Sequence, residues 1–583
     1  MQQNKGTKKI GTIKESSEKN AYTIFHTLNK MKISRIGQFF NSVKRCGVDV
    51  SDILMLLLMM PFYHIKSVPL LVKSGISEMQ DVECSNSVFY DLKNNPKINW
   101  RSLLYLVAVR FNKLSQEMNP EAATKVRTFI ADDSPLPKSG IKTELVSGMH
   151  DYVSCSYIFG YKILVLGYWD ALSFYPLDFS LHREKGNRIY KAKQRLETAN
   201  KRLRVQRKEV NKIERELITA RQTFKLIKKR NKHKQTKSAT KQIEQAANAV
   251  KPKANKLKKS KAKYTELENK AIELRLELKE TRRKHPDYGL TKKQMEQQFK
   301  KHRDPQTPGK EREAEVDIKK TTNMMTMLKR AVRRGFQADY LLTDSWFFNM
   351  ELVKLISKLN KKCSINLLSM AKIGITNYNL VSNNRTYNAA ELLVKFERKA
   401  ITARSHNSKY IKVPVTYGGV RINLFFVKMG KSTSWKLLAT TDLSINFRKL
   451  MDVYQIRWSI EIFFRESKQY LSLGKCKSTS FDAQIADATI SLTQYTLLAF
   501  HQRMCDYSSF DGIFSAALED AMQHNIAAKL QEMFWVVLEV FCDFTGVDIF
   551  DFTETLIRNE DTYLKLQQLN PIFNESLHKN RVA

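Results

Sequence analysis

The segment YQIRWSIEIFFRESK, residues 454–468, has the composition of a helix, because it is rich in Arg, Glu, Lys and Ile and contains neither Gly nor Pro. Four polar residues in it are spaced three, four and seven apart: Tyr454, Arg457, Glu461 and Lys468. On one continuous helix they fall within roughly 60° of one face, and apolar residues cover the other sides. A buried helix with such a face indicates a functional site. The alternative is a solvated stripe of ion pairs, and spacing alone does not decide between the two.

The composition of the whole chain indicates a nucleic-acid partner. The 583 residues carry 99 Lys and Arg against 58 Asp and Glu, a formal net charge of +41. So large a charge favours a polyanion, most commonly nucleic acid. Seven cysteines without a C-x-x-C pair are typical of reduced thiols in an intracellular protein. The strongest apolar run, 53–60, is far shorter than the roughly 20 residues of a membrane helix, so we expect a soluble protein with no membrane partner.

Strand-like and helical segments follow one another in an order that predicts an α/β fold with a mixed sheet. Apolar runs rich in Ile, Val, Phe and Tyr predict strands at 126–134, 157–169, 171–180 and 336–347. The N-terminal helical region is compatible both with DNA-end binding and with plain packing. The expected regions are a helical N-terminal part, a first core part, a basic insertion, a second core part, a β-rich insertion, a core helix and a helical C-terminal part: 1–125, 126–182, 183–300, 301–362, 363–442, 443–485 and 486–583.

The basic insertion has the heptad pattern of a coiled-coil hairpin. Apolar residues recur every seven positions in two arms: Leu196, Leu203, Val210, Leu217 and Phe224, then Val250, Leu257, Tyr264, Ala271 and Leu278. Two such arms joined by a polar linker predict an antiparallel coiled coil, with a break near Pro252. Residues 183–335 hold 48 Lys and Arg against 18 Asp and Glu. A charge this one-sided favours an arm that contacts an anion, and the alternative is a solvated spacer.

Three acidic residues occupy positions from which they can converge. Asp132 and Asp344 each end a predicted strand, and Glu461 lies on the helix that follows the β-rich segment. Acids at the carboxyl ends of neighbouring strands meet at the mouth of a sheet. Three carboxylates in one crevice need a counter-charge, and hard divalent cations such as Mg²⁺ or Mn²⁺ supply it. Two such ions would suit in-line phosphoryl transfer, although each Asp taken alone is compatible with a turn or cap.

The segment 454–468 also resembles the Tyr-x2-Arg-x3-Glu-x6-Lys signature of bacterial transposases of the insertion-sequence-4 family. FIADDSPLPKSG (129–140) and LLTDSW (341–346) resemble that family's first and second Asp blocks, and all three occur in the family's order. The resemblance covers roughly residues 126–475. It implies a DDE enzyme with a ribonuclease H-like core and a β-rich insertion between the second Asp and the Glu. The basic insertion at 183–300 has no counterpart in the family's general pattern.

The resemblance implies roles for individual residues. Asp132, Asp344 and Glu461 would be the catalytic metal ligands, holding two Mg²⁺ or Mn²⁺ ions, with Asp133 as the alternative for the first place. Three residues would hold the DNA strand end and its phosphates: Tyr454, Arg457 and Lys468. Some relatives hold a flipped base with a Trp before the Glu helix. Trp435 lies near that position but about two residues out of register, and we expect Trp346 and Trp458 in the core.

The resemblance therefore implies a transposase that cleaves double-stranded DNA at terminal inverted repeats and joins the 3′ ends to target DNA. We expect a homodimer on the DNA ends and a bacterial cytoplasmic, nucleoid-associated location. Two alternatives remain open at this point: a metal-dependent nuclease on the same core without strand transfer, and a catalytically inactive DNA-binding or assembly protein. The terminal-repeat sequence, the target preference and hairpin formation are not predicted by the sequence.

Overall fold

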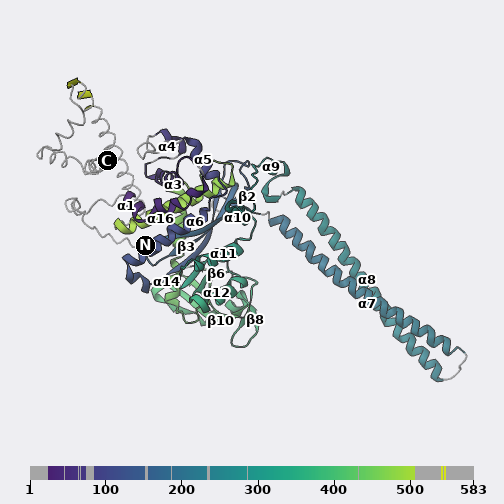
Figure 1. Cartoon of the computed structure of the whole chain (residues 1–583). Coiled ribbons are helices and arrows are strands. Elements are labelled where there is room, and N and C mark those ends of the chain that lie inside the picture. The colour runs from purple at the N-terminus through teal and green to yellow at the C-terminus, as the bar shows by residue number, and fades with distance from the viewer. Residues whose placement is uncertain are drawn as a thin grey trace. The chain divides into compact units, whose positions relative to one another are not determined.

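The computed structural model describes residues 24–505, apart from 45, 64, 66, 74–84, 152–154, 185–186, 233–236, 285–286 and 431, together with five residues between 537 and 545 (Figure 1). Most of the helical region expected at 486–583 therefore lies outside the described residues. The chain divides into two units. The core unit comprises residues 1–134, 163–180 and 302–583, and the arm unit comprises residues 135–162 and 181–301.

The core unit is built on a mixed sheet whose centre is parallel. Strand β5 (Tyr340–Thr343) pairs in parallel with β1 (Thr128–Pro137) on one side and with β6 (Asn366–Ala371) on the other. All four residues of β5 are buried, as expected for a strand that is covered on both faces. Antiparallel strands extend the sheet beyond β6: β12 (Lys436–Thr440), β11 (Val420–Met429) and β10 (Ser408–Tyr417).

Shorter strands complete the two ends of this sheet. Beyond β10 lie β7 (Asn377–Leu380), β8 (Thr386–Asn388) and β9 (Ile401–Ala403). Beside β1 lies β3 (Ser156–Trp169), which also pairs with β4 (Phe174–His182). All residues of β4 are buried, which places it in the interior. The parallel pairing of the three central strands ends at Ala131, Thr343 and Ser369, and two of the acidic residues described below directly follow this point on β1 and after β5.

Helices pack around the sheet and around one central helix, α16 (Phe481–Cys505). The others in the core unit are α1 (Ile24–Lys30), α2 (Ile33–Gln38), α3 (Val50–Met59), α4 (Val68–Lys73), α5 (Asn86–Asn94), α6 (Trp100–Met118), α10 (Pro308–Glu315), α11 (Lys320–Arg333), α12 (Met350–Cys363), α13 (Ala389–Phe396), α14 (Phe447–Gln455) and α15 (Trp458–Tyr470). Phe500 of α16 packs against Phe111 of α6, with ring centroids 5.5 Å apart. Among the described residues, no helix combines the length and hydrophobicity needed to cross a bilayer.

A network of buried ion pairs joins β4 to the helices of the core unit. Asp178 is fully buried and accepts a hydrogen bond from Nε of Arg101, at 3.1 Å, and another from Nε of Arg330, at 2.9 Å. Arg101 also binds Glu315 of α10. Because an unpaired buried charge costs several kcal/mol, these partners hold α6, α10 and α11 against β4.

The arm unit contains two long helices that run antiparallel, α7 (Asn187–Arg230) and α8 (Lys237–Lys284), which lie side by side in Figure 1. Buried and half-buried residues of α7 recur at alternating spacings of three and four, the pattern of a coiled-coil seam. One of them is Gln206, whose Nε2 donates to Oγ of Ser260 on α8 at 2.8 Å. A buried polar pair of this kind fixes the alignment of the two helices.

The expected break near Pro252 is wrong, because α8 continues through this residue without interruption. Proline removes one backbone hydrogen bond and normally bends or ends a helix. In α8, Val250 and Leu257 are half-buried on either side of Pro252, at the seven-residue spacing of the seam. Packing against α7 therefore offsets the missing hydrogen bond. The arm unit also contains β2 (Ser147–Asp151), which pairs with the first residues of β3, and the short helix α9 (Lys292–Glu296).

Candidate active site

The parallel pairing of β1 and β5 places Asp132 beside Asp344. The register matches Ala131 with Thr343, and the two acids are the next residues along the chain. Asp344 directly follows the last residue of β5, but Asp132 lies within β1, which continues to Pro137, so the expectation that Asp132 ends its strand is wrong. Backbone contacts fix both carboxylates. The N–H of Asp133 donates to Oδ1 of Asp132 at 2.8 Å, and the N–H of Trp346 donates to Oδ1 of Asp344 at 2.9 Å. The two carboxylates expected at the mouth of the sheet therefore lie side by side.

This proximity changes the proton affinity of Asp132. Burial of its carboxyl group, and next the negative charge of Asp344, raise the pKa of Asp132 to about 7. The hydrogen bond from the Asp133 amide and the charge of Arg457 act in the opposite direction and only partly compensate. A half-buried carboxylate with a raised pKa, such as that of Asp132, needs a positive partner in order to be fully ionised at neutral pH.

Arg457 links the first and third acidic residues. One Nη of its guanidinium donates to Oδ2 of Asp132 at 3.0 Å, and the other donates to Oε1 of Glu461. Tyr454 lies in the same cluster: its hydroxyl donates to the carbonyl oxygen of Thr343 at 3.4 Å, and burial raises its pKa, so that the phenol stays protonated. The structure thus brings together five side chains that lie on, or directly beside, β1, β5, α14 and α15: Asp132, Asp344, Tyr454, Arg457 and Glu461.

The two neighbouring acids of β1 have different partners, because successive side chains of a strand point to opposite faces. Asp133 forms an ion pair with Nζ of Lys320, the first residue of α11, at 2.6 Å. Asp132 instead faces Asp344 and Arg457. Lys468, near the other end of α15, donates to Oγ of Ser134 at 2.6 Å and so lies along the same edge of β1.

The expectation of one continuous helix over 454–468 is wrong. Helix α14 ends at Gln455 and α15 begins at Trp458. The connecting residues remain in the right-handed helical region but form hydrogen bonds three residues apart, for example from the N–H of Arg457 to the carbonyl of Tyr454 at 3.1 Å. This tighter turn has about 3.0 residues per turn instead of 3.6, so it shifts Tyr454 around the axis relative to Glu461.

The apolar side of helix α15, opposite its polar residues, packs into the core unit. Phe463 packs against Phe174 of β4, with ring centroids 5.3 Å apart, and against Tyr495 of α16, with ring centroids 4.8 Å apart. Ile460 and Phe464 are also buried. This packing holds Glu461 toward the end of β1.

Two tryptophans that we expected in the core are exposed. Trp346 and Trp458 are each 57% exposed, because the buried positions beside them are taken by Phe347 and Ile460. The ring of Trp346 lies between two ammonium groups: its centroid is 5.6 Å from Nζ of Lys320 and 5.2 Å from Nζ of Lys372. An exposed aromatic ring flanked by cations is typical of surfaces that stack on nucleobases and bind phosphates.

The third tryptophan near the expected position has a different environment. Nε1 of Trp435 donates to Glu397 at 3.3 Å, and Nζ of Lys428 lies 5.8 Å from its ring centroid. Sequence reasoning missed Lys320 and Lys372, because no motif connects them with the acidic residues. The one indication in the sequence that this surface lies near the acidic residues is the position of Trp346, two residues after Asp344.

The acidic residues of this group provide some, but not all, of the ligands that a divalent cation would need. Asp132 and Asp344 supply hard oxygen ligands side by side, and their repulsion is relieved when a cation binds. Glu461 is held by Arg457, and in the described part of the chain no three His, Cys, Asp or Glu side chains form a complete metal-binding group. Binding of an ion with all three carboxylates would therefore require Arg457 to release at least one of them.

The raised pKa of Asp132 gives a prediction for the metal-free protein. In the presence of a chelator, the free energy of unfolding should fall as the pH rises from about 5 to about 7 and then level off. Between these values the folded protein retains a proton that the unfolded carboxyl, with a pKa near 3.9, has already lost. Denaturant titrations of the wild type and of Asp132→Asn, which lacks this group, measure the effect. Parallel curves for the two proteins over this pH range would contradict the prediction.

Comparison with protein families is consistent with this geometry. Residues 315–497 match the family model of the transposase DDE domain, and the matched segment contains Asp344, Glu461 and the residues around them. The similarity indicates a DDE transposase, an enzyme that catalyses DNA cleavage and transfer, and hence a DNA substrate. The large mixed sheet is consistent with the ribonuclease H-like fold of such enzymes. No curated protein matches the chain.

Proposed function

We propose that this protein is a transposase of the insertion-sequence-4 type, which cleaves DNA at the terminal inverted repeats of its element and joins the free 3′ ends to target DNA. The observation that carries the proposal is the adjacency of Asp132 and Asp344 at the point where the parallel pairing of β1 and β5 ends, with Glu461 joined to Asp132 through Arg457. The match to the transposase DDE domain supports the same reaction class. The remaining features of the signature, Tyr454 and Lys468, lie on α14 and α15 close to this group.

Asp132, Asp344 and Glu461 would hold Mg²⁺ or Mn²⁺, and we propose two ions. When bound, such ions stabilise charge on the attacking and leaving oxygens of a phosphoryl transfer. Asp132 is the better first ligand than Asp133, because Asp133 is already neutralised by Lys320 at 2.6 Å. No covalent bond between the protein and the DNA forms in this scheme. A water molecule attacks the scissile phosphate and breaks its bond to the 3′ oxygen, which leaves as a free 3′ hydroxyl. This hydroxyl then attacks a phosphate of the target strand and displaces the 3′ oxygen of the adjoining target nucleotide, so that each step forms one P–O bond and breaks one.

Arg457 would change partners during this reaction. In the absence of DNA and metal, its guanidinium neutralises Asp132 and Glu461. Once cations take over that role, the fork-shaped guanidinium is free to bind a phosphate of the DNA end with two hydrogen bonds. Lys468, whose Nζ contacts Ser134, would bind a neighbouring phosphate as a point charge. Tyr454 would support the position of Arg457, whose Cζ lies 5.9 Å from its ring centroid.

Trp346 would bind an unpaired base beside the cleaved bond, while Lys320 and Lys372 bind the adjacent phosphates. Stacking of one base on an aromatic side chain contributes about 1–3 kcal/mol. Trp346→Ala is therefore expected to weaken complexes with DNA ends about tenfold or more, and Trp346→Phe should retain most of the affinity. Gel-shift titrations with end-containing duplexes that carry 2-aminopurine near the cleavage site would measure both affinity and unstacking.

Two matched variants test the choice of this tryptophan. Trp458→Ala removes an equally exposed ring and should leave affinity and unstacking nearly unchanged. Trp435→Ala tests the residue closest to the position used by some relatives. If Trp435→Ala abolishes the 2-aminopurine signal while Trp346→Ala does not, Trp435 is the base-binding residue.

The experiment that tests the proposed function uses the full chain, DNA that carries the ends of its element, and Mg²⁺ or Mn²⁺. We expect nicking at the ends followed by joining to a second duplex. Metal-dependent nicking without joining would indicate a nuclease on the same core. Binding without nicking under any metal condition would indicate an assembly protein. We further propose a homodimer on the paired DNA ends and action in the bacterial cytoplasm on nucleoid DNA.

A further inference from the structure

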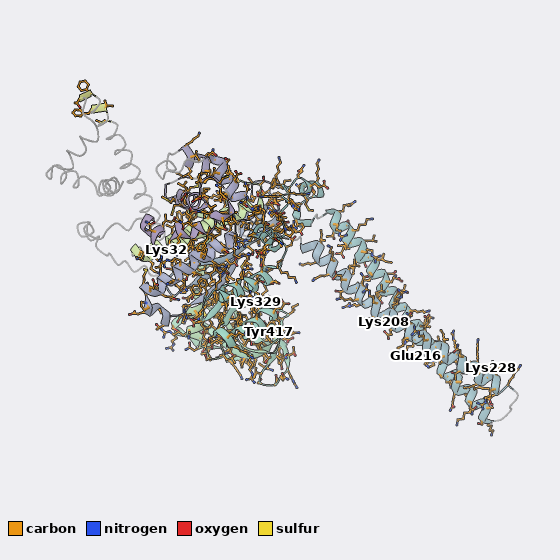
Figure 2. The ribbon with its side chains drawn as sticks, in the orientation of Figure 1. Lys32, Lys208, Glu216, Lys228, Lys329 and Tyr417 are labelled. Carbon is orange, nitrogen blue, oxygen red and sulfur yellow. The ribbon has the colours of Figure 1, made fainter. Side chains whose placement is uncertain are left out.

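The positive charge of the α7/α8 hairpin is concentrated in the half next to its turn. Residues 217–265, called the distal half here, carry 16 Lys and Arg and a single acid, Glu244. The basal half, residues 187–216 and 266–284, carries 17 Lys and Arg together with nine Asp and Glu. In Figure 2, Lys208, Glu216 and Lys228 follow one another along the hairpin toward the turn. The two halves have nearly the same number of cations but very different net charges.

The distal half has too few acidic residues to neutralise its own cations. Basal acids pair with cations of the opposite helix, as in the contact of Arg195 with Glu277, at 2.9 Å, and in that of Glu214 with Lys261, a distal cation near the boundary between the two halves. With one acid among 16 cations, the distal half has almost no capacity for such pairs. Its Lys and Arg side chains in the described helices are nearly all exposed. Repulsion among them destabilises the hairpin unless a polyanion is bound.

The side chains of the distal half favour duplex DNA over single strands. Its two aromatic residues, Phe224 and Tyr264, are half-buried at positions of the coiled-coil seam. In the described part of the distal half, the exposed sides of the two helices therefore offer cations but no Phe, Tyr or Trp ring on which an unpaired base could stack. A rigid helix pair is also suited to follow a rigid duplex. The 29 residues of α8 from Lys237 to Thr265 extend over about 43 Å, along which duplex DNA carries about 25 phosphates.

We propose that the distal half of the hairpin is a second DNA-binding surface, which holds duplex DNA through its phosphates without reading sequence. This inference deepens the proposed function, since a transposase must hold flanking or target DNA as well as the cleaved ends. Its test needs neither metal nor cleavage, so that its failure and the failure of the proposed function are distinguishable. Each phosphate contact contributes about 0.9 to the slope of log affinity against log salt concentration.

The experiment compares two full-length variants that lose equal charge. The distal variant replaces six exposed cations by glutamine: Arg221, Lys225, Lys229, Lys251, Lys256 and Lys258. The basal variant does the same at Lys201, Arg204, Lys208, Lys212, Arg215 and Lys270. Fluorescence anisotropy with a duplex of arbitrary sequence, about 40 base pairs long, in chelator and from about 50 to about 300 mM KCl, gives the salt slope. We expect the distal variant to lose about three units or more of slope and the basal variant less than about one.

None of the substituted residues is at a buried seam position, and circular dichroism checks that helix content is retained. A third variant replaces the five lysines of the distal variant by arginine, keeps the charge and should keep the wild-type slope: Lys225, Lys229, Lys251, Lys256 and Lys258. Equal slopes in the distal and basal variants would overturn the proposal, because only total charge would then matter. An unchanged slope in both would also overturn it, and loss of self-association in the distal variant alone would identify a dimerisation surface instead.

Discussion

Asparagine in place of Asp132 or Asp344 is expected to lower metal-dependent cleavage of DNA ends by at least about 10³-fold while leaving DNA binding nearly intact. The substitution keeps the size of the side chain and removes the charge that would hold a divalent cation. Loss of several kcal/mol of transition-state stabilisation corresponds to a rate loss of this order. Glu461→Gln should behave in the same way. Single-turnover cleavage assays, together with gel-shift titrations in chelator, separate the chemical step from binding.

Asp133→Asn is the matched control for this experiment. It removes a carboxylate adjacent in sequence, but one that pairs with Lys320 instead of facing Asp344. We expect cleavage to be reduced by less than about tenfold. An inactive Asp133→Asn protein together with an active Asp132→Asn protein would exchange the roles of the two residues. Full activity of any one of the Asp132, Asp344 or Glu461 variants would remove that residue from the site.

Arg457→Ala is expected to reduce strand transfer and stable complexes with DNA ends by about 10²-fold. Its guanidinium is the group that neutralises two carboxylates in the free protein and is proposed to bind phosphate in the complex. Charge-assisted hydrogen bonds to phosphate contribute roughly 1.5–3 kcal/mol, which is a factor of about ten to a hundred. Arg457→Lys keeps the charge without the fork, so it should restore only part of the activity.

Arg448→Ala removes the same charge from an exposed position of α14 and serves as the control for Arg457→Ala. It should change end complexes by less than a factor of about two, since exposed charges contribute little. Calorimetry of Mn²⁺ binding completes the test. If Arg457→Ala loses Mn²⁺ binding while its DNA complexes are unchanged, Arg457 acts on the metal site and not on DNA.

The sequence predicted those parts of the site that depend on local patterns. Acids at the ends of apolar strands predicted the pair formed by Asp132 and Asp344, and heptad spacing predicted a helix pair that the structure contains. The contact of Arg457 with Asp132 joins residues 325 positions apart, and no local pattern encodes such a distance. The same holds for Lys320, which approaches Asp133 only because α11 begins beside β1.

Predictions from the average behaviour of helices and side chains were wrong at positions where local hydrogen bonds or tertiary packing impose a different structure. A uniform period of 3.6 residues does not anticipate the tight turn at 456–457, which is formed by backbone hydrogen bonds three residues apart. Hydrophobicity placed Trp346 and Trp458 in the interior, but smaller neighbours occupy the buried positions. Pro252 was expected to end a helix, yet α8 continues because it packs along a partner helix.

The long insertion between β4 and α10 has a consequence for the order in which the protein folds during synthesis. Thr128 of β1 pairs with Tyr340 of β5, so β1 must wait for about 200 residues to be translated before its partner strand exists. At about 5–20 residues per second, this delay lasts roughly 10–40 s. The hairpin needs only its own two helices, which are adjacent in sequence, and such local contacts form early. The arm can therefore be complete on the ribosome before Asp132 and Asp344 have met.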